Sequence, residues 1–450
     1  MRRIYGTAIT LVWLMFVFPG LHSCSNSGGY EARIEAEVDR IRIVDTHEHL
    51  SHEYMMLERK AHAPLDFSIL FDLYIFDDMA SVGYTKAIQE KIRDVSIPVR
   101  ERWMILEPYW KKVETTSYAR MVKIMARDIY GVDEINENTV EELSKRINDA
   151  YQPGWYKTVL KDKSQIDISV LDFNLMDVNE DFFVHVQRFE EFVLVYSAPQ
   201  IQSVCERYGK ESHSLADFEA ALDDAFAKGL EKGMVAIKNG MAYARTLDYM
   251  DPDREAATRV FDRMIRSTDS LSFEEAKPLQ DYMWHQIAQK AEKNHLPIQV
   301  HTGLQAWGRN DVRMSDPLLL IRQFNLYPDT KFILFHGSYP YGGALSVLAK
   351  NYPNVYIDMC WMYLISPSYS ERYLYEWLET VPASKIMAFG GDHFYVEGAY
   401  AHQVIAREVI AKVLIRKVQE GHFSEEQAIN VARMILRNNA IEILKLDLPI

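Results

Sequence analysis

The second half of the chain alternates short apolar runs with helical stretches, and each run ends in a polar or charged residue. Such runs occupy residues 296–301, 331–336, 354–358 and 385–392. Repetition of strand, helix and strand predicts a parallel sheet. Earlier runs of the same kind lie at 41–47, 166–173, 192–196 and 233–238, with a weaker one at 69–76. These runs supply eight strands with one to spare, so we expect a (β/α)₈ barrel.

The region after the first strand has a different character. Residues 52–165 read as mainly helical, for instance where Tyr118, Met121, Val122 and Met125 follow one another at helical spacing. We expect this segment to be an insertion after the first strands that covers the mouth of the barrel. Because no Pro/Gly/Ser-rich linker divides the rest, residues 36–450 are predicted to form one barrel domain that includes this insertion.

Charge and composition limit the kind of partner. The chain has 50 Lys and Arg against 64 Asp and Glu, a net charge of −14, and 48% hydrophobic residues. An acidic protein without a basic patch repels phosphate backbones, so we expect a small-molecule substrate and no nucleic acid. A homo-oligomer stays open as an expectation.

The N-terminus reads as an export signal. Arg2 and Arg3 precede an apolar run over residues 4–18, which is short for a membrane span. The segment 21–24 resembles the lipobox of bacterial lipoproteins, although His22 departs from the usual small residue. We therefore predict a signal peptide at 1–23, lipidation of Cys24, and a tether at 24–35. The expected location is a membrane-anchored lipoprotein in the periplasm or at the cell surface, with plain secretion or a retained anchor as alternatives.

The first predicted strand ends in a pair of histidines. His47 and His49 are two positions apart, so on an extended segment both side chains face the same side and can bind one metal ion. With 14 histidines in the chain, such a pair by itself is a weak signal.

Further strand ends strengthen the metal hypothesis. His301 and His336 each end a buried-looking strand, and Asp392 follows the last one. Parallel barrels gather such ends at one face, where imidazoles and a carboxylate suit a catalytic divalent cation. Lys238 ends another strand, but an ammonium group has no lone pair with which to bind a metal. His393 is expected in a loop, and His185 and His295 in ordinary helical or turn positions.

These motifs together are familiar. The sequences Val-Asp-Thr-His-Glu-His at 44–49, Val-Ala-Ile-Lys at 235–238, Gln-Val-His-Thr-Gly at 299–303, Leu-Phe-His-Gly at 334–337 and Gly-Gly-Asp-His at 390–393 resemble those of the amidohydrolase superfamily, in the branch of the uronate isomerases and amidohydrolase-2 proteins. The resemblance covers residues 47–49 and then nearly all of 233–444.

The resemblance implies a role for each strand-end residue. The implied metal ligands are His47, His49, Lys238, His301, His336 and Asp392. It also makes Asp392 the proton acceptor, with His336 as the next candidate, and suggests that Lys238 carries a carbamate bridging two ions. A site with one ion and a free Lys238 ammonium that binds substrate is the alternative. Zinc is the expected metal, as one or two ions.

Several polar and aromatic residues that follow strand ends are candidates for substrate binding: Tyr243, Arg245, Trp307, Arg309, Arg313, Trp361 and Tyr363. Arginine pairs bidentately with carboxylate, which suggests a carboxylate-bearing substrate, although each of these residues could equally be a solvated loop residue.

The sequence thus predicts a metal-dependent hydrolase. The ion would lower the pKa of a bound water, and the resulting nucleophile would attack an amide, lactone or ester carbonyl. An isomerase or decarboxylase with the same ligands is the first alternative, and a surface lipoprotein that binds without turnover is the second.

Overall fold

A computed structural model describes residues 27–72, 74–172 and 178–449. Within them, eight parallel strands follow one another around a barrel in chain order, β1 pairing with β2 and so on to β8. Bonds from Thr46 N to Phe389 O (3.0 Å) and from Asp392 N to His47 O (2.8 Å) close the gap between the two ends. The expected (β/α)₈ barrel is confirmed. The strands are β1 Ile43–Glu48, β2 Ile166–Leu171, β3 Phe183–Arg188, β4 Ala236–Asn239, β5 Ile298–Val300, β6 Phe332–Leu334, β7 Val355–Asp358 and β8 Ile386–Met387.

Two of the expected strands are wrong. The run at 192–196 overlaps a short helix, α8 (Glu190–Val193), whose Phe192 packs on Phe218 outside the barrel, with ring centroids 5.4 Å apart. The third strand is instead β3, which was missed because His185 and Gln187 interrupt its apolar residues. The weaker run at 69–76 is helical, since Asp66 caps a 3-10 turn there by accepting a hydrogen bond from Ser68 N (3.0 Å).

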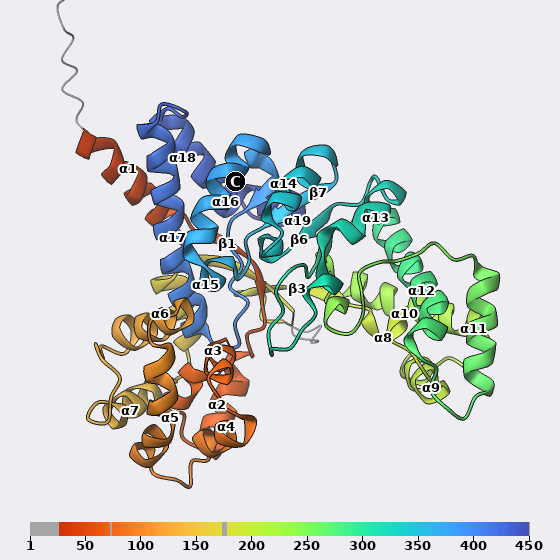
Figure 1. Ribbon diagram of the computed structural model, residues 1–450, viewed down its shortest axis with the longest axis horizontal. Coiled ribbons are helices and arrows are strands. Elements are labelled where there is room, and N and C mark those ends of the chain that lie inside the picture. The colour runs from red at the N-terminus through yellow and green to blue at the C-terminus, as the bar shows by residue number, and fades with distance from the viewer. Residues whose placement is uncertain (1–26, 73, 173–177, 450) are drawn as a thin grey trace, which may run out of the picture.

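The helical insertion lies between β1 and β2, after the first strand alone, and its helices gather at one end of the molecule (Figure 1). It contains α2 Glu53–His62, α3 Ile75–Ser81, α4 Lys86–Arg93, α5 Val99–Val113, α6 Ser117–Ile124 and α7 Val140–Ala150, a 3-10 turn at Phe67–Phe71, and π turns at Met125–Ile129 and Lys157–Lys163.

The insertion is tied to the barrel by a buried carboxyl group. Glu397, fully buried near the start of α17 (Val396–Gln419), accepts hydrogen bonds from Tyr130 Oη (2.5 Å), Tyr151 Oη (2.9 Å) and Trp155 Nε1 (3.1 Å). All three donors belong to the insertion. Burial raises the pKa of Glu397, and the three neutral donors satisfy its oxygens.

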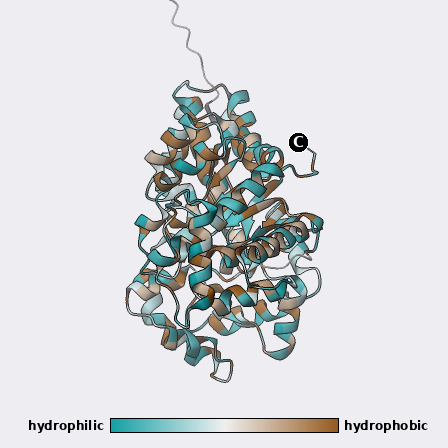
Figure 2. Cartoon of the chain, turned by 90° about the vertical axis from the view of Figure 1, so that its right-hand side faces the viewer, coloured by the Kyte–Doolittle hydropathy of each residue, from teal (hydrophilic) through white to brown (hydrophobic). Residues whose placement is uncertain are grey.

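The remaining helices surround the strands, and both polar and apolar residues recur along them, as expected of helices that pack one face on a core (Figure 2). They are α9 Ala198–Arg207, α10 Leu215–Glu231, α11 Arg254–Arg266, α12 Phe273–Lys293, α13 Ile321–Leu326, α14 Gly342–Asn351, α15 Met362–Ile365, α16 Pro367–Thr380, α18 Glu425–Arg433 and α19 Asn439–Leu444.

The expected tether differs from what the structure shows. Helix α1 (Ser27–Arg40) already begins at Ser27, and Ile34 and Val38 on one of its faces are fully buried. Apolar residues four apart share a helix face, so this segment packs on the barrel and does not act as a free linker. The predicted signal peptide and Cys24 lie outside the described residues. Among the helices that are described, none combines the length and apolarity needed to span a membrane.

Candidate metal centre

One cluster of donors forms where β1, β2 and β8 end. His47 lies on β1, His49 follows it, Asp172 follows β2, and Asp392 lies five residues beyond β8. His49 Nε2 is 3.2 Å and His47 Nε2 3.5 Å from Asp392 Oδ1, and His47 Nε2 is 3.8 Å from Asp172 Oδ2. Donor atoms of His47, His49 and Asp172 are close enough to share one metal ion. The structure thus brings together the three predicted ligands of these strands and adds Asp172.

The second cluster lies where β5 and β6 end. His336 Nε2 faces His301 Nδ1 at 2.9 Å. The other nitrogen of each ring meets a backbone carbonyl, His336 Nδ1 with Cys360 O (3.0 Å) and His301 Nε2 with Leu304 O (2.9 Å). A ring nitrogen beside a carbonyl must carry the hydrogen and donate it, so in the neutral rings both facing nitrogens carry lone pairs.

The electrostatics keep the second pair neutral. Burial lowers the pKa of His336 to about 4 and, with neighbouring His336, lowers that of His301 well below its usual value. Two lone pairs at 2.9 Å repel, and a cation between or beside them removes the conflict. Backbone carbonyls that fix the outer nitrogen are also the usual support of metal-binding histidines. The residues present therefore fit a divalent cation.

The two histidines of the first cluster differ from each other. Burial and the charge of Lys238 lower the pKa of His47 well below its usual value. Burial lowers the pKa of His49, but the hydrogen bond to Asp392 and the charge of Asp172 outweigh it and raise the pKa above its ordinary value. Burial would raise the pKa of Asp392, but His49 and the other imidazoles hold it well below the usual range. His49 Nδ1 donates to Asp172 O (2.7 Å). A cation at this position would therefore replace a proton on His49 Nε2.

Lys238 lies between the two clusters, on β4. Its Nζ is 3.3 Å from His47 Nε2 and 3.9 Å from the centre of the Phe335 ring. Burial lowers the pKa of Lys238, with Asp172 acting in the opposite direction. A buried amine with a lowered pKa is more often neutral, the form that reacts with carbon dioxide to give a carbamate.

The loop that carries Asp392 is held by hydrogen bonds from three consecutive backbone amides. Asp392 has φ 64°, a left-handed conformation that is strained for a non-glycine residue. In addition to the bond from Asp392 N that closes the barrel, Gly391 N donates to Asp45 Oδ1 (3.0 Å) and His393 N to Glu48 Oε2 (2.6 Å). A Cβ on Gly391 would overlap Glu48 Oε1, so a larger residue there would displace the Glu48 carboxylate that holds this loop.

Three of the predicted substrate-binding residues lie at the site. Tyr243 packs on His301, with ring centroids 4.6 Å apart. Trp361 is buried and meets His336 edge to face at 5.3 Å. Trp307 is 54% exposed above Phe394, and Arg309 lies two residues further along the same loop, also exposed.

The other candidates are placed elsewhere. Arg245 is a correction: its guanidinium is fully buried and pairs with Asp281 (2.5 Å), which leaves it no free charge for a substrate. Arg313 has an 86% exposed side chain paired with Asp311 in the same loop. Tyr363 is fully buried against Met359 Sδ (3.3 Å).

Two charged residues of the site were missed by the sequence reasoning. Asp172 directly follows β2, and Arg188 ends β3, where its Nη2 lies 2.6 Å and its Nε 2.8 Å from the Asp172 carboxylate. Arg188 lowers the pKa of Asp172, which burial would raise. A charged residue at a strand end was the available signal for Asp172. Arg188 was hidden because β3 was not recognised, and His185 on the same strand is correspondingly not in a helix or turn.

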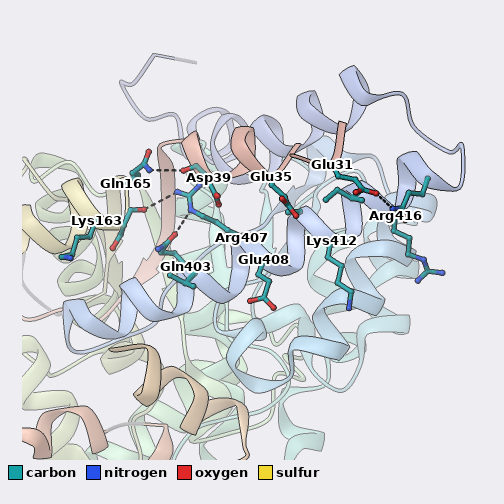
Figure 3. Close-up of a pocket in the computed structure, with 15 residues that line it drawn as sticks. Glu31, Glu35, Asp39, Lys163, Gln165, Gln403, Arg407, Glu408, Lys412 and Arg416 are labelled. Atoms are coloured by element: carbon teal, nitrogen blue, oxygen red, sulfur yellow. Dashed lines mark hydrogen bonds between the residues drawn. The ribbon is translucent and has the colours of Figure 1, made fainter. Parts of the chain in front are cut away.

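A large groove lies away from these donors. Its volume is about 800 Å³, and it runs between α1 and α17, with residues 163–165 beside it (Figure 3). These segments precede β1 and β2, so the groove is at the amino ends of the strands, opposite the donor clusters. Its buried Arg407 donates to Ile41 O (2.9 Å) and Gln403 Oε1 (2.6 Å), which is a structural role.

The structure is a (β/α)₈ barrel whose clustered donor residues fit a divalent cation. Residues 208–446, more than half of the chain, match the amidohydrolase family. The chain belongs to this family.

Individual known proteins resemble this chain to different degrees. Protein fluG of Emericella nidulans is 33% identical over 243 residues, which is 51% of this chain but only 27% of that protein. Uronate isomerase from Thermotoga maritima is similar in structure, with a TM-score of 0.77 and 17% identity over 92% of this chain and 97% of the other. Glucuronate isomerase from Caulobacter crescentus is also similar in structure, with a TM-score of 0.75 and 18% identity over 95% of this chain and 96% of the other. At these identities, the structural likeness establishes the fold alone.

Proposed function

We propose that the protein is a metal-dependent hydrolase that adds water to an amide, lactone or ester of a small carboxylate-bearing substrate. The observation that carries the proposal is the pair of facing lone pairs on His301 and His336, 2.9 Å apart, opposite the anionic Asp392. Donors on both sides of one barrel mouth fit a site with two cations, in which both the nucleophile and the carbonyl oxygen can be stabilised.

The cations would supply Lewis acidity, which polarises a carbonyl and makes water more acidic. The protein's own groups do the rest. Asp392, whose pKa is held well below its usual value, is ionised at neutral pH and accepts the proton of the attacking water at Oδ1. Its left-handed backbone, fixed by Asp45 and Glu48, aims this oxygen at the two first-strand histidines. His301 and His336 stay neutral and keep their lone pairs directed at the site.

Lys238 is the proposed bridge between the two halves. As a carbamate it would offer anionic oxygens in place of an ammonium, and its position on β4, within 3.3 Å of His47 Nε2, is compatible with that role. Burial favours the neutral amine that such a modification requires.

An isomerase is the second candidate. It is favoured by one observation, the likeness to uronate isomerase over 92% of the chain, which extends beyond the barrel core into much of the helical insertion. The same donors would then orient a hydroxy acid while a proton moves between neighbouring carbons. A decarboxylase at this site is a further version of the same alternative.

Water labelled with heavy oxygen separates these reactions. The zinc-loaded protein is given lactones, N-acyl amino acids and uronates, and products are analysed by mass spectrometry and NMR. Hydrolysis places one labelled oxygen in the product acid for each bond broken. Conversion of a uronate to its ketose, with no hydrolysis of any other compound, would replace the hydrolase proposal by the isomerase.

We also propose that the protein is exported and anchored through Cys24. The support is the sequence pattern of residues 2–24 alone. Cys24→Ser is expected to move the protein from the membrane fraction to a soluble or uncleaved form, as followed by fractionation and intact mass. A cleaved Cys24→Ser protein that stays in the membrane fraction would argue against lipidation.

A further inference from the structure

The loop after β5 has an unusual conformation at the barrel mouth. Trp307, Gly308 and Arg309 are all left-handed, with φ 77°, 62° and 59°. For a bulky residue such as Trp307 this conformation is strained, and such strain persists only where the surroundings impose it. Here Trp307 N donates to Asp77 Oδ2 on α3 (3.0 Å), which ties the loop to the helical insertion.

The tied loop holds a large aromatic ring in solvent. Trp307 is 54% exposed, which is costly for an indole without a partner. One face of the ring lies almost parallel to Phe394, at 6.4 Å between centroids and an interplanar angle of 22°. Phe394 in turn lies 5.9 Å from the His49 ring. A series of rings therefore leads from a first-strand metal ligand to the surface.

A second contact ties the loop to the other half of the site. Ala306 N, next to Trp307, donates to Tyr243 Oη (3.2 Å), and the Tyr243 ring packs on His301 at 4.6 Å. The loop thus spans from the β5 side to the β8 side of the mouth. Tyr243 is itself 44% exposed, so aromatic surface flanks both sets of ligands.

Arg309 adds a free charge beside the indole. It is exposed, and among the described residues it has no carboxylate partner, in contrast to Arg313 four residues later, which is paired with Asp311. A guanidinium in this state can bind a carboxylate of a ligand.

We infer that the loop 306–309 selects substrates that carry a planar aromatic ring together with a carboxylate, such as N-aroyl amino acids. The ring stacks on the exposed indole of Trp307, and the carboxylate pairs with Arg309. This inference rests on the proposed hydrolase function for the scissile amide, but ring recognition is measured by binding and not by turnover.

Three related ligands isolate the two contacts. N-benzoylglycine has both features, N-(cyclohexylcarbonyl)glycine replaces the flat ring by a saturated one of similar size, and N-benzoylglycinamide removes the charge. Binding is measured by calorimetry on the zinc-loaded Asp392→Asn protein, in which turnover is suppressed. Trp307→Ala, Trp307→Phe and Arg309→Gln are compared in this background. Val347→Ala, at a position with the same 54% exposure on α14, and Arg313→Gln serve as matched controls.

We expect N-benzoylglycine to bind more tightly than its cyclohexyl analogue. Trp307→Ala should weaken N-benzoylglycine about 3- to 10-fold and the cyclohexyl ligand much less, with most of the loss restored by Trp307→Phe. Arg309→Gln should weaken both acids about 2- to 5-fold and leave the amide unchanged.

Equal affinities of the two acids, an equal effect of Trp307→Ala on both, or no binding of N-benzoylglycine at millimolar concentration would overturn the inference. Ring preference without hydrolysis of any amide would leave the inference standing and refute the hydrolase. Hydrolysis of an amide without ring preference would support the hydrolase and overturn the inference about the loop 306–309.

Discussion

The two halves of the candidate metal centre differ in their carboxylates: the first half has them beside its histidines, although the pKa of His47 is lowered by burial as in the second half. Around β1 and β8 the histidines lie beside carboxylates, with His49 Nε2 3.2 Å from Asp392 Oδ1, and the pKa of His49 is raised. Around β5 and β6, His301 and His336 each donate to a backbone carbonyl and face each other with lone pairs, and burial lowers both of their pKa values. The first half would attract a cation by its charge, and the second half would receive one at its facing lone pairs.

This difference indicates which half takes part in proton transfer and which half mainly binds metal. We assign proton transfer to Asp392, because its anionic carboxylate faces the first-strand histidines. The neutral imidazole pair can bind and orient but cannot neutralise charge. Changes in the first half should therefore alter the rate, and changes in the second half should mainly alter how many ions are held.

The largest expected effect follows from Asp392→Asn. The amide oxygen can still approach the ion but cannot accept a proton, so kcat should fall by about 10² to 10⁴-fold while much of the metal is retained. Steady-state kinetics and elemental analysis on the same preparations measure both. His49→Ala is the control and should lose metal as well as activity. Near wild-type turnover in Asp392→Asn would move the proton acceptor elsewhere, with His336 examined next.

A second effect concerns Lys238, the residue between the two halves. We expect wild-type protein to hold about two ions per chain and Lys238→Ala about one, because the bridging oxygens are lost. Elemental analysis gives the count, and intact mass under native conditions reveals carbon dioxide added to Lys238. Acetate should partly restore the second ion in the variant, since it supplies a carboxylate in the vacated space. One ion in wild type, with no added mass, would establish the mononuclear alternative.

The smallest expected effect concerns the stability of the metal-free protein at acidic pH. The pKa of His336 and that of His402 are both lowered by burial to about 4. Between about pH 6.5 and pH 4 the unfolded chain therefore binds more protons than the native one, and the free energy of unfolding falls as the pH falls through this window. Each histidine contributes about 3 kcal/mol at most.

Urea unfolding of the chelator-treated protein across this range tests the effect. His402 is not among the ligands, so His402→Phe should reduce the pH dependence while zinc binding stays intact. An unfolding free energy that is constant from pH 6.5 to pH 4 would show that these histidines are not held neutral.

The positions of the clustered donor residues were predictable because their signal is local. A histidine or aspartate that ends an apolar run marks the carboxyl edge of a strand, and His47, His301 and Asp392 are found there. Arg245 also follows a strand end, but it is paired with Asp281, which comes from α12, 36 residues along the chain. No spacing rule reveals that partner. Strand β3 was missed because its polar residues His185, Gln187 and Arg188 resemble those of an exposed segment.

The carboxyl group of Glu397 has a consequence for how ligands reach the barrel. The helical insertion could swing aside only by withdrawing three donors, those of Tyr130, Tyr151 and Trp155, from a carboxyl group that stays in the protein interior. Removal of hydrogen bonds from a buried acceptor is strongly unfavourable. The insertion is therefore a fixed wall of the barrel, and ligand entry does not rely on its displacement.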